Sequence, residues 1–347
     1  MPLLPVTDER IMLKHGAGGR ATRRLIHDAV LDAFRPGADA PGVVGLSALD
    51  DGAAFPIGDR WLVLTTDSHV IQPLFFPGGD IGRLAVCGTV NDLAMMGATE
   101  VLGLTCSVII EEGFPRRDLD RILASMREAC LEAGATVVTG DTKVMGKGEI
   151  DGIVINTTGV GMTARVITDC GLSAGDRILV TGTLGDHGMA VMASRHGLAL
   201  EATLVSDVAP INALIRAAID AAPGAITAMK DPTRGGVAGA LHEMATKGRV
   251  GIVLDESALP VRPQARGVSE LVGIDPLLVA NEGKAVMAVR ADAAARVLAA
   301  LRAHPLGVDA AIVGVCTADH EGLVVLDTGF GRRLVTEPDG ELLPRIC

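Results

Sequence analysis

Aromatic side chains and positive charge are both scarce in this chain of 347 residues. The sequence has no Tyr, one Trp and six Phe, and its 31 Lys and Arg are outnumbered by 42 Asp and Glu, which gives a formal net charge of −11. Few rings are available to stack on exposed bases, and the net charge repels a phosphate backbone. The composition therefore argues against a nucleic-acid-binding protein and predicts an aliphatic core.

Long apolar runs and closely spaced cysteines are also missing. No stretch of 18 or more apolar residues occurs, and Pro and charged residues interrupt the first 20 residues. We therefore expect neither a membrane span nor a secretory signal, and we predict a cytoplasmic protein. No CxxC pair indicates a zinc, iron–sulfur or thioredoxin-like site. Five of the six cysteines are expected to be small buried residues, whereas Cys347 follows a polar segment with two prolines.

The common nucleotide signatures are absent, although glycine is abundant. Neither Gly-Lys pair of the chain fits a P-loop, and the GVGMTA segment at 159–164 leads into no long predicted helix, so we read it as a chance match to a dinucleotide motif. The 43 glycines are about 12% of the residues, against a usual ~7%. Many loops are therefore expected to bring the backbone close to a ligand or to another segment.

Strands and helices are predicted to alternate along both halves of the chain. The first half has apolar, β-branched strand segments and two amphipathic helix segments: strands at 61–66, 101–110, 136–139 and 152–160, helices at 80–96 and 116–133. The second half repeats the alternation, with strands at 177–181, 250–254, 285–290 and 321–326 and helices at 186–196, 208–221, 291–303 and one that ends near Lys247. We predict an α/β (α+β) protein with a boundary near 165–175, divided into domains 1–168 and 169–334 and a mobile tail over 335–347.

Acidic and amide side chains cluster at predicted loop positions beside these strands. They are Asp50, Asp51, Asp67, Asn91, Asp92 and Asp141, of which Asp67 and Asp141 are expected to follow strands directly. Oxygen ligands of this kind suit Mg²⁺, which prefers carboxylates together with phosphate oxygens. Turn formation or helix capping would explain each residue by itself. The four segments together favour a site for a metal and a phosphate.

Two glycine-rich segments and two isolated polar residues are further candidates. HGAGGR at 15–20 and DPTRGGVAG at 231–239 each join a glycine pair to an Arg, and the second precedes a predicted helix whose amides could face phosphate, although flexible turns explain both segments almost as well. Lys143 and Glu282 adjoin apolar strand segments and could transfer protons, or could be ordinary surface residues. His187 and His242 are interpreted as structural.

Taken in order, these motifs resemble a known family. HGAGGR, DDGAAF, TTDSHV, GTVNDLAMMGA, VTGDTKV, DPTRGGVAG, ANEGK and PRIC are similar to the motifs of the HypE family of hydrogenase maturation proteins, in the PurM-like superfamily of ATP-using enzymes. The resemblance spans nearly the whole chain. Thiamine-monophosphate kinase, selenophosphate synthetase and aminoimidazole ribonucleotide synthetase share some of the fragments, whereas the Cys after Pro-Arg-Ile is specific to HypE.

The resemblance implies a two-domain PurM-like fold and a homodimer that pairs through its N-terminal halves, with ATP and Mg²⁺ near the subunit interface. By position, Mg²⁺ and phosphates would be held by Asp50, Asp51, Asp67 and Asp92. Asn91 and Asp141 would support these ligands. The nucleotide site would also include Asp231 and the loop with His15, Gly16, Gly18 and Gly19.

The same resemblance implies a reaction on the chain's own tail. The carbamoyltransferase HypF would load Cys347 to give a thiocarboxamide, and ATP-dependent dehydration would convert it to a thiocyanate. The cyano group would then pass to the iron of [NiFe]-hydrogenase on the HypC–HypD scaffold complex. Lys143 and Glu282 match positions that deprotonate the amide.

Two other functions remain open at this point. A PurM-like small-molecule kinase or synthetase would use the nucleotide site and leave Cys347 incidental. A non-catalytic cysteine carrier would bind nucleotide only for assembly, although Lys143 and Glu282 would then have no evident role. An ATPase activity that does not need the tail would favour the kinase, and full function after Glu282→Gln would favour the carrier.

Overall fold

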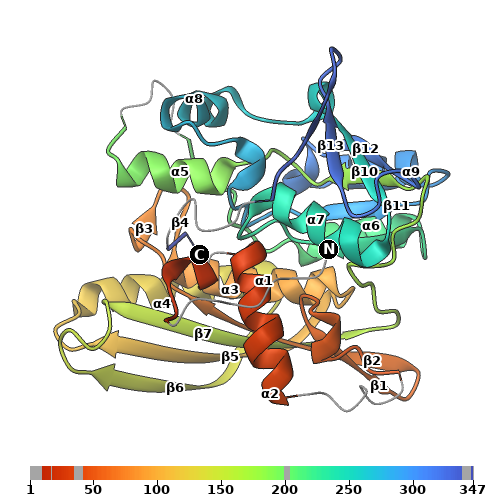
Figure 1. The fold of residues 1–347 in the computed structure, drawn as a ribbon. Coiled ribbons are helices and arrows are strands. Elements are labelled where there is room, and N and C mark those ends of the chain that lie inside the picture. The colour runs from red at the N-terminus through yellow and green to blue at the C-terminus, as the bar shows by residue number, and fades with distance from the viewer. Residues whose placement is uncertain (1–9, 17, 35–41, 199–203, 338–344, 347) are drawn as a thin grey trace.

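The computed structural model consists of two α/β halves, each built on its own sheet (Figure 1). The structure describes residues 10–16, 18–34, 42–198, 204–337 and 345–346. In the view of Figure 1 the N-terminal sheet lies below and the C-terminal sheet above, with helices between them. The mixed α/β class predicted from the sequence is confirmed.

The N-terminal half is a five-stranded sheet covered by two helices. Its strand order is β1 (Ala53–Ile57), β2 (Arg60–His69), β7 (Ile153–Thr163), β5 (Glu100–Glu111) and β6 (Val137–Met145). Only β5 and β6 run parallel, and β6 is an edge strand. Helices α3 (Ile81–Met95) and α4 (Arg116–Ala133) pack against each other over this sheet (Figure 1).

The helix boundaries follow from local sequence signals. The Asp80 carboxylate caps α3 by accepting hydrogen bonds from the amides of Gly82 and Arg83 at 2.8 and 3.0 Å. Helix α4 buries the apolar stripe predicted for it, including Ile122 and Met126, and it ends before Gly134, whose φ of 65° suits a glycine. Both helices were predicted within one residue at each end.

The C-terminal half is a seven-stranded sheet between helices. Its order is β14 (Arg332–Leu334), β13 (Val324–Asp327), β10 (Gly251–Asp255), β12 (Ala311–Thr317), β8 (Arg177–Val180), β11 (Val286–Val289) and β9 (Ile226–Lys230). The two faces of the sheet bury separate apolar clusters, one with α7 (Gly236–Gly248) and the other with α6 (Asn212–Ala221) and α9 (Ala294–Ala303). Helices α5 (Asp186–Arg195) and α8 (Pro263–Val272) pack together beside this sheet (Figure 1).

The two halves share apolar contacts and a polar bridge. One buried cluster contains Ile81 and Leu84 of the first half together with Met189 and Val279 of the second. The Asn91 side chain, on α3, donates hydrogen bonds to the carbonyls of Ala209 and Glu282 and accepts one from the Ile211 amide at 2.9 Å. Helix α3 therefore holds the second half of the chain against the first.

Some expectations were wrong or incomplete. Asp67 and Asp141 lie inside β2 and β6, not after them, because both strands continue past their apolar residues into polar ones. Cys170 is exposed, whereas Cys87, Cys130 and Cys316 are buried as expected and Cys106 is half-buried. Several elements were not predicted: β1, β9, β12, β14 and α8.

In the part of the chain that the structure describes, no helix is long and apolar enough to cross a membrane.

The tail region is described only at its two ends. Val335 is buried and its amide donates to the Val324 carbonyl at 2.9 Å, which fixes the root of the tail on β13. Arg345 and Ile346 contact the first half of the chain and helix α5. Residues 338–344 and Cys347 lie outside the described residues.

Candidate active site

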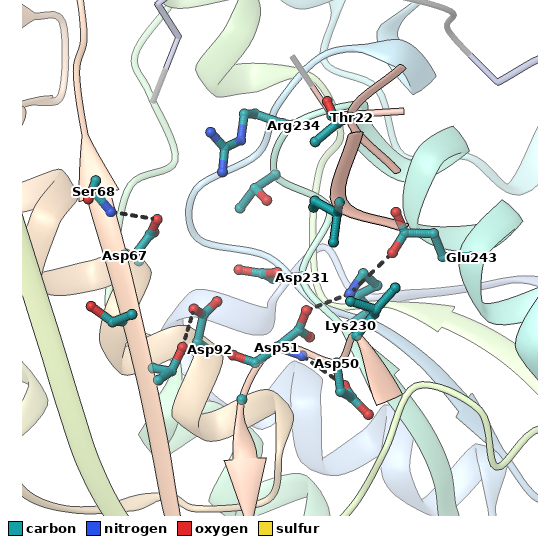
Figure 2. Close-up of a pocket in the computed structure, with 18 of the residues that line it drawn as sticks. Thr22, Asp50, Asp51, Asp67, Ser68, Asp92, Lys230, Asp231, Arg234 and Glu243 are labelled. Carbon is teal, nitrogen blue, oxygen red and sulfur yellow. Dashed lines mark hydrogen bonds and ion pairs between the residues drawn. The ribbon is translucent and has the colours of Figure 1, made fainter. Parts of the chain in front are cut away.

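A cavity of about 690 Å³ lies where the two halves meet, and it is lined by charged residues from both (Figure 2). The first half contributes Asp50, Asp51, Asp67 and Asp92, and the second contributes Asp231 and Glu282. In Figure 2 the carboxylates of Asp51, Asp92 and Asp231 face one another at the centre. The residues predicted to bind a metal and phosphates are therefore brought together in one place.

Loop, strand and helix geometry each position part of this acidic group. Asp50 and Asp51 stand in the turn before β1, where the Asp50 carboxylate accepts hydrogen bonds from the amides of Asp51 and Asp169 at 2.9 and 3.1 Å. Asp92 lies in the last turn of α3, and the Thr65 hydroxyl of β2 donates to it at 3.0 Å. These contacts fix both groups before any ligand is present.

The carboxylates resist ionisation because they are buried beside one another. Burial, followed by the neighbouring carboxylates Asp231, Asp67 and Asp51, raises the pKa of Asp92 well above its usual range. Burial and Asp51 do the same to the pKa of Asp231. Burial and the charges of Asp169 and Asp51 raise the pKa of Asp50 to about 7. A cation that enters the cavity would favour the ionised form of every member of the group.

One lysine balances part of this negative charge. The Lys230 ammonium, at the end of β9, lies 2.5 Å from Asp51, 3.4 Å from Glu243 and 3.7 Å from Asp169 (Figure 2). Lys247 adds a second contact to Asp169 at 2.6 Å. The pKa of Lys230 is raised well above its usual value, since these carboxylates outweigh the opposing effect of burial.

Asp67 differs from the other acidic residues. Burial alone would raise its pKa, but the imidazole of His69 at 3.1 Å and the charge of Arg234 outweigh burial and lower it. Gly88 of α3 makes room for this pair, because a Cβ there would lie 2.7 Å from His69 Nε2. Asp67 is thus the cavity carboxylate that the protein itself keeps ionised.

The two glycine-rich segments meet at the mouth of the cavity. Gly16 and Gly18 line it, and a Cβ on Gly18, whose φ is 75°, would lie 2.9 Å from the Cβ of Arg234. Gly235 and Gly236 also have positive φ, 84° and 62°, in the turn that leads into α7. This close packing of two backbones, with the start of α7 behind it, is suited to contact with phosphate groups.

Glu282 closes the inner end of the cavity. It is 3% exposed, its amide donates to Asp207 at 3.1 Å, and its carbonyl accepts from Asn91. Burial, with Asp231, Asp207 and Asp67 nearby, raises its pKa well above the usual range. Its Oε1 and the Asp51 Oδ2 are buried atoms without a hydrogen-bond partner among the described residues. Both oxygens are thus available to a ligand.

These residues fit Mg²⁺ bound together with a nucleotide. No three His, Cys, Asp or Glu side chains of the described segments form a ready-made metal cage. Mg²⁺ is usually held by one or two carboxylates, waters and substrate phosphates, so an acidic cavity with unpartnered oxygens and no complete cage meets its requirements. The acidic cavity and the phosphate-suited glycine turns lie side by side.

Several predicted site residues lie elsewhere in this chain. Asp141 and Lys143 are exposed on the edge strand β6 and do not line the acidic cavity. His15 is buried below its loop, where its Nδ1 accepts from the Met12 amide, and Gly19 precedes α1 (Arg20–Leu25). Asn91 supports the Glu282 backbone and does not line the cavity. Cys347 lies outside the described residues.

Other cavity residues were not identified from the sequence. The Lys230 ammonium lies 3.4 Å from the Glu243 carboxylate, and both residues line the cavity. Thr22, His69 and Arg234 line it as well. Lys230 could have been found, because it directly precedes the Asp231 motif at the end of a strand. Glu243 and Thr22 carry no local signal, since only the fold brings their helices to the site.

The comparisons with known proteins agree with this geometry. Residues 49–163 match the family model "AIR synthase related protein, N-terminal domain", and residues 173–327 match the corresponding C-terminal domain. Carbamoyl dehydratase HypE of Rhizobium leguminosarum bv. viciae is 46% identical over 99% of this chain and 97% of its own length. Carbamoyl dehydratase HypE of Escherichia coli K12 is also 46% identical, over 97% of this chain and 99% of its own.

Solved structures are similar as well. A HypE–HypF complex contains a chain that is 44% identical, with a TM-score of 0.84 over 90% of this chain and 99% of that one. A HypE structure in complex with ATP is 40% identical, with a TM-score of 0.79 over 97% and 100%. With two AIR synthase-related domains and full-length identity of this order, the chain belongs to the HypE family of carbamoyl dehydratases, which act in hydrogenase maturation.

Proposed function

We propose that this protein uses ATP and Mg²⁺ to dehydrate a carbamoyl group carried on the thiol of its own Cys347. The amide oxygen accepts the terminal phosphoryl group of ATP, the C–O bond breaks as phosphate leaves, and the nitrogen loses both protons. The thiocarboxamide becomes a thiocyanate, and ADP, phosphate and a proton are released. The observation that carries the proposal is the acidic cavity between the two halves, with Glu282 at its inner end.

Asp50, Asp51, Asp67 and Asp92 are the proposed ligands of the metal and phosphates, with Asp231 beside them. Bound Mg²⁺ would neutralise charge that develops on the transferred phosphoryl group. The raised pKa values of Asp92 and Asp231 support this assignment, because a cation would stabilise exactly the ionised forms that the protein leaves unfavourable. Lys230 holds Asp51 in place through the contact at 2.5 Å.

Glu282 is the proposed acceptor of an amide proton. A raised pKa means that the Glu282 carboxylate, when ionised, binds a proton more strongly than an ordinary glutamate does. Its unpartnered Oε1 is available to a substrate N–H. Arg234, Gly16 and Gly18, which also line the cavity, are proposed to contact the nucleotide.

Lys143 and Asp141 are proposed to reach the site from a second copy of the chain. Both project from β6, an edge strand with an unpaired side, and Val138 and Val144 on the same strand are 63% and 66% exposed. An exposed apolar edge strand is suited to pairing with another strand. A homodimer formed through β6 would bury these valines and offer the partner's lysine and aspartate to this cavity.

The proposed partners follow from the reaction and from the relatives. HypF, which is present in the solved complex with a similar chain, would load Cys347. The HypC–HypD complex would accept the cyano group. The cytoplasm is the proposed setting, because the reaction consumes ATP.

The direct test is the intact mass of protein carbamoylated at Cys347, measured before and after addition of ATP and Mg²⁺. We expect the loss of one water, localised to Cys347 by fragmentation, and no loss with a non-hydrolysable ATP analogue. Consumption of ATP while the carbamoyl group keeps its oxygen would contradict the proposal and favour a kinase or synthetase. ATP binding without any reaction would favour a carrier.

A further inference from the structure

The last two described residues of the tail, Arg345 and Ile346, pack against helix α5 and the segment that follows β2. Ile346 is 5% exposed and belongs to the same buried cluster as Ile71, Phe76 and Met189. The end of the tail is thus packed as part of the protein's interior.

Most of the hydrogen bonds in this contact are made to the backbone of the tail. The Arg345 carbonyl accepts hydrogen bonds from the Gln72 amide at 3.2 Å and from the Arg195 guanidinium at 3.0 Å. Arg195 also donates to the Gln72 carbonyl at 2.7 Å, so it joins the two segments. The Arg345 side chain forms an ion pair with Asp151. Arg345 has a φ of 55°, a conformation that these contacts stabilise in a non-glycine residue.

His187 makes the final contact before Cys347. Its Nε2 lies 2.8 Å from the Ile346 carbonyl and its Nδ1 lies 2.8 Å from the Ser206 hydroxyl. A carbonyl only accepts, so Nε2 carries the hydrogen and Nδ1 accepts from Ser206. The edge-on ring of Phe76, at 5.3 Å between centroids, holds the imidazole in place. His187 is fully buried, and burial lowers its pKa and keeps it neutral.

Helix α5 also contacts the segment that carries Glu282. The Gly188 amide, next to His187, donates to the Ala280 carbonyl at 3.0 Å, and Ala280 stands two residues before Glu282. Gly188 leaves room for this approach, because a Cβ there would lie 2.7 Å from the Cβ of Val279. The start of α5 therefore packs against the segment that carries Glu282.

We propose that His187 and Arg195 form a tail clamp, which holds the carbonyls of Arg345 and Ile346 while the next residue, Cys347, reacts. Both are positioning residues, and the inference rests on the dehydratase function proposed above. The clamp contacts backbone and the Ile346 side chain only. It therefore accepts the tail whether Cys347 carries a free thiol, a carbamoyl group or a cyano group, and it leaves that group free to react.

The first experiment tests docking without any catalysis. Trypsin cleaves after Arg345 only when this arginine leaves Asp151 and enters the protease, so cleavage reports undocking. We expect His187→Ala and Arg195→Ala to release the Ile346–Cys347 dipeptide about tenfold faster than the unmodified sequence, measured by intact mass. His242→Ala is the matched control, because His242 Nε2 contacts the Val335 carbonyl at 2.6 Å, at the root of the tail. Equal cleavage rates in all four proteins would overturn the clamp.

The second experiment tests positioning. With carbamoylated protein and saturating ATP, the single-turnover rate of dehydration should fall about tenfold in His187→Ala and Arg195→Ala, while the Kd for ATP stays unchanged. His187→Gln, which keeps a donor, should recover part of the rate. Arg195 lies at the surface end of α5, so its variant remains informative if His187→Ala does not fold.

The two results separate the two proposals. If the unmodified protein never dehydrates its tail but the variants lose protection from trypsin, the proposed function is wrong and the clamp stands. If dehydration proceeds at the same rate in unmodified protein and in Arg195→Ala, positioning by the clamp is wrong and the proposed function stands.

Discussion

At the scale of single residues, the active site depends on carboxylates that repel one another. Asp51, Asp92 and Asp231 are buried together, and the described chain provides Lys230 as the cation in direct contact with Asp51. Such an arrangement costs folding free energy in the ligand-free protein, because each ionised carboxylate raises the pKa of the next. The same repulsion becomes useful when a cation binds, since the cation then relieves it.

Replacing Lys230 should expose this cost. We expect Lys230→Met to lower the free energy of unfolding by about 3 kcal/mol at pH 8, because Asp51, Glu243 and Asp169 lose a buried partner. The loss of stability should shrink towards pH 5, because burial raises the pKa of Asp51 and this carboxyl can take up a proton there. Urea unfolding at both pH values measures it. Arg60→Met is the control, since its ion pair with Glu100 is exposed and should be worth less than about 1 kcal/mol.

Buried thiols should remain unreactive while the tail is modified. Burial, and to a lesser extent Asp176, raises the pKa of Cys316 to about 12. At pH 8 about one Cys316 thiol in ten thousand is then ionised, so iodoacetamide should label it only after unfolding. The folded pKa lies above the unfolded value of 9.0, so this residue's contribution to stability is complete below pH 9 and is lost as the pH rises towards 12. Labelling of Cys316 in the folded protein at pH 8 would contradict this assignment.

At the scale of elements, the edge strand β6 has an unusual composition. Exposed valines stand near both ends of the strand and a polar run that includes Asp141 and Lys143 lies between them, and the next strand of the sheet covers one of its two edges. Natural edge strands usually avoid exposed apolar side chains. This strand is therefore suited to contact with another chain.

Charges on β6 should prevent dimerisation without unfolding the sheet. We expect the double variant Val138→Lys, Val144→Lys to be monomeric by light scattering, with an unchanged circular dichroism spectrum, because like charges would face each other across the interface. Leu271→Lys on α8 is the matched control, since Leu271 is equally exposed at 71% but lies in the other half of the chain. A dimeric double variant would exclude β6 as the interface.

The elements best predicted from the sequence were those with a complete local signal. Helix α4 has an apolar stripe and a terminal glycine, and its limits were predicted correctly. Strands β9 and β12 and helix α8 were missed because their burial depends on neighbours far along the chain. The acidic residues could be named because their motifs are continuous in the sequence. The roles of Lys230, Glu243 and His187 were not identified, because their partners lie far along the chain and meet them only in the folded protein.

At the scale of the whole molecule, the two halves of the chain meet around one cavity. The first half supplies the proposed metal ligands and the second half supplies Asp231 and Glu282, whereas the docked residues of the tail contact α5. Asp141 and Lys143 are the predicted site residues that the described part of a single chain leaves on the outer edge of its sheet. The proposed role of Lys143 in the reaction therefore requires a second copy of the chain.

Mixed dimers provide the test of a shared site. Lys143→Ala and Glu282→Gln should each abolish dehydration of the carbamoylated tail. If Lys143 acts from the partner copy, a dimer containing one of each variant has one site with both substitutions and one site with neither. Random mixing makes half of the dimers mixed, so about a quarter of the full activity should return. If Lys143 and Glu282 acted within the same chain, every site would carry one of the two substitutions and mixing would restore nothing. Recovery that disappears when β6 carries Val138→Lys and Val144→Lys would assign the shared site to this strand.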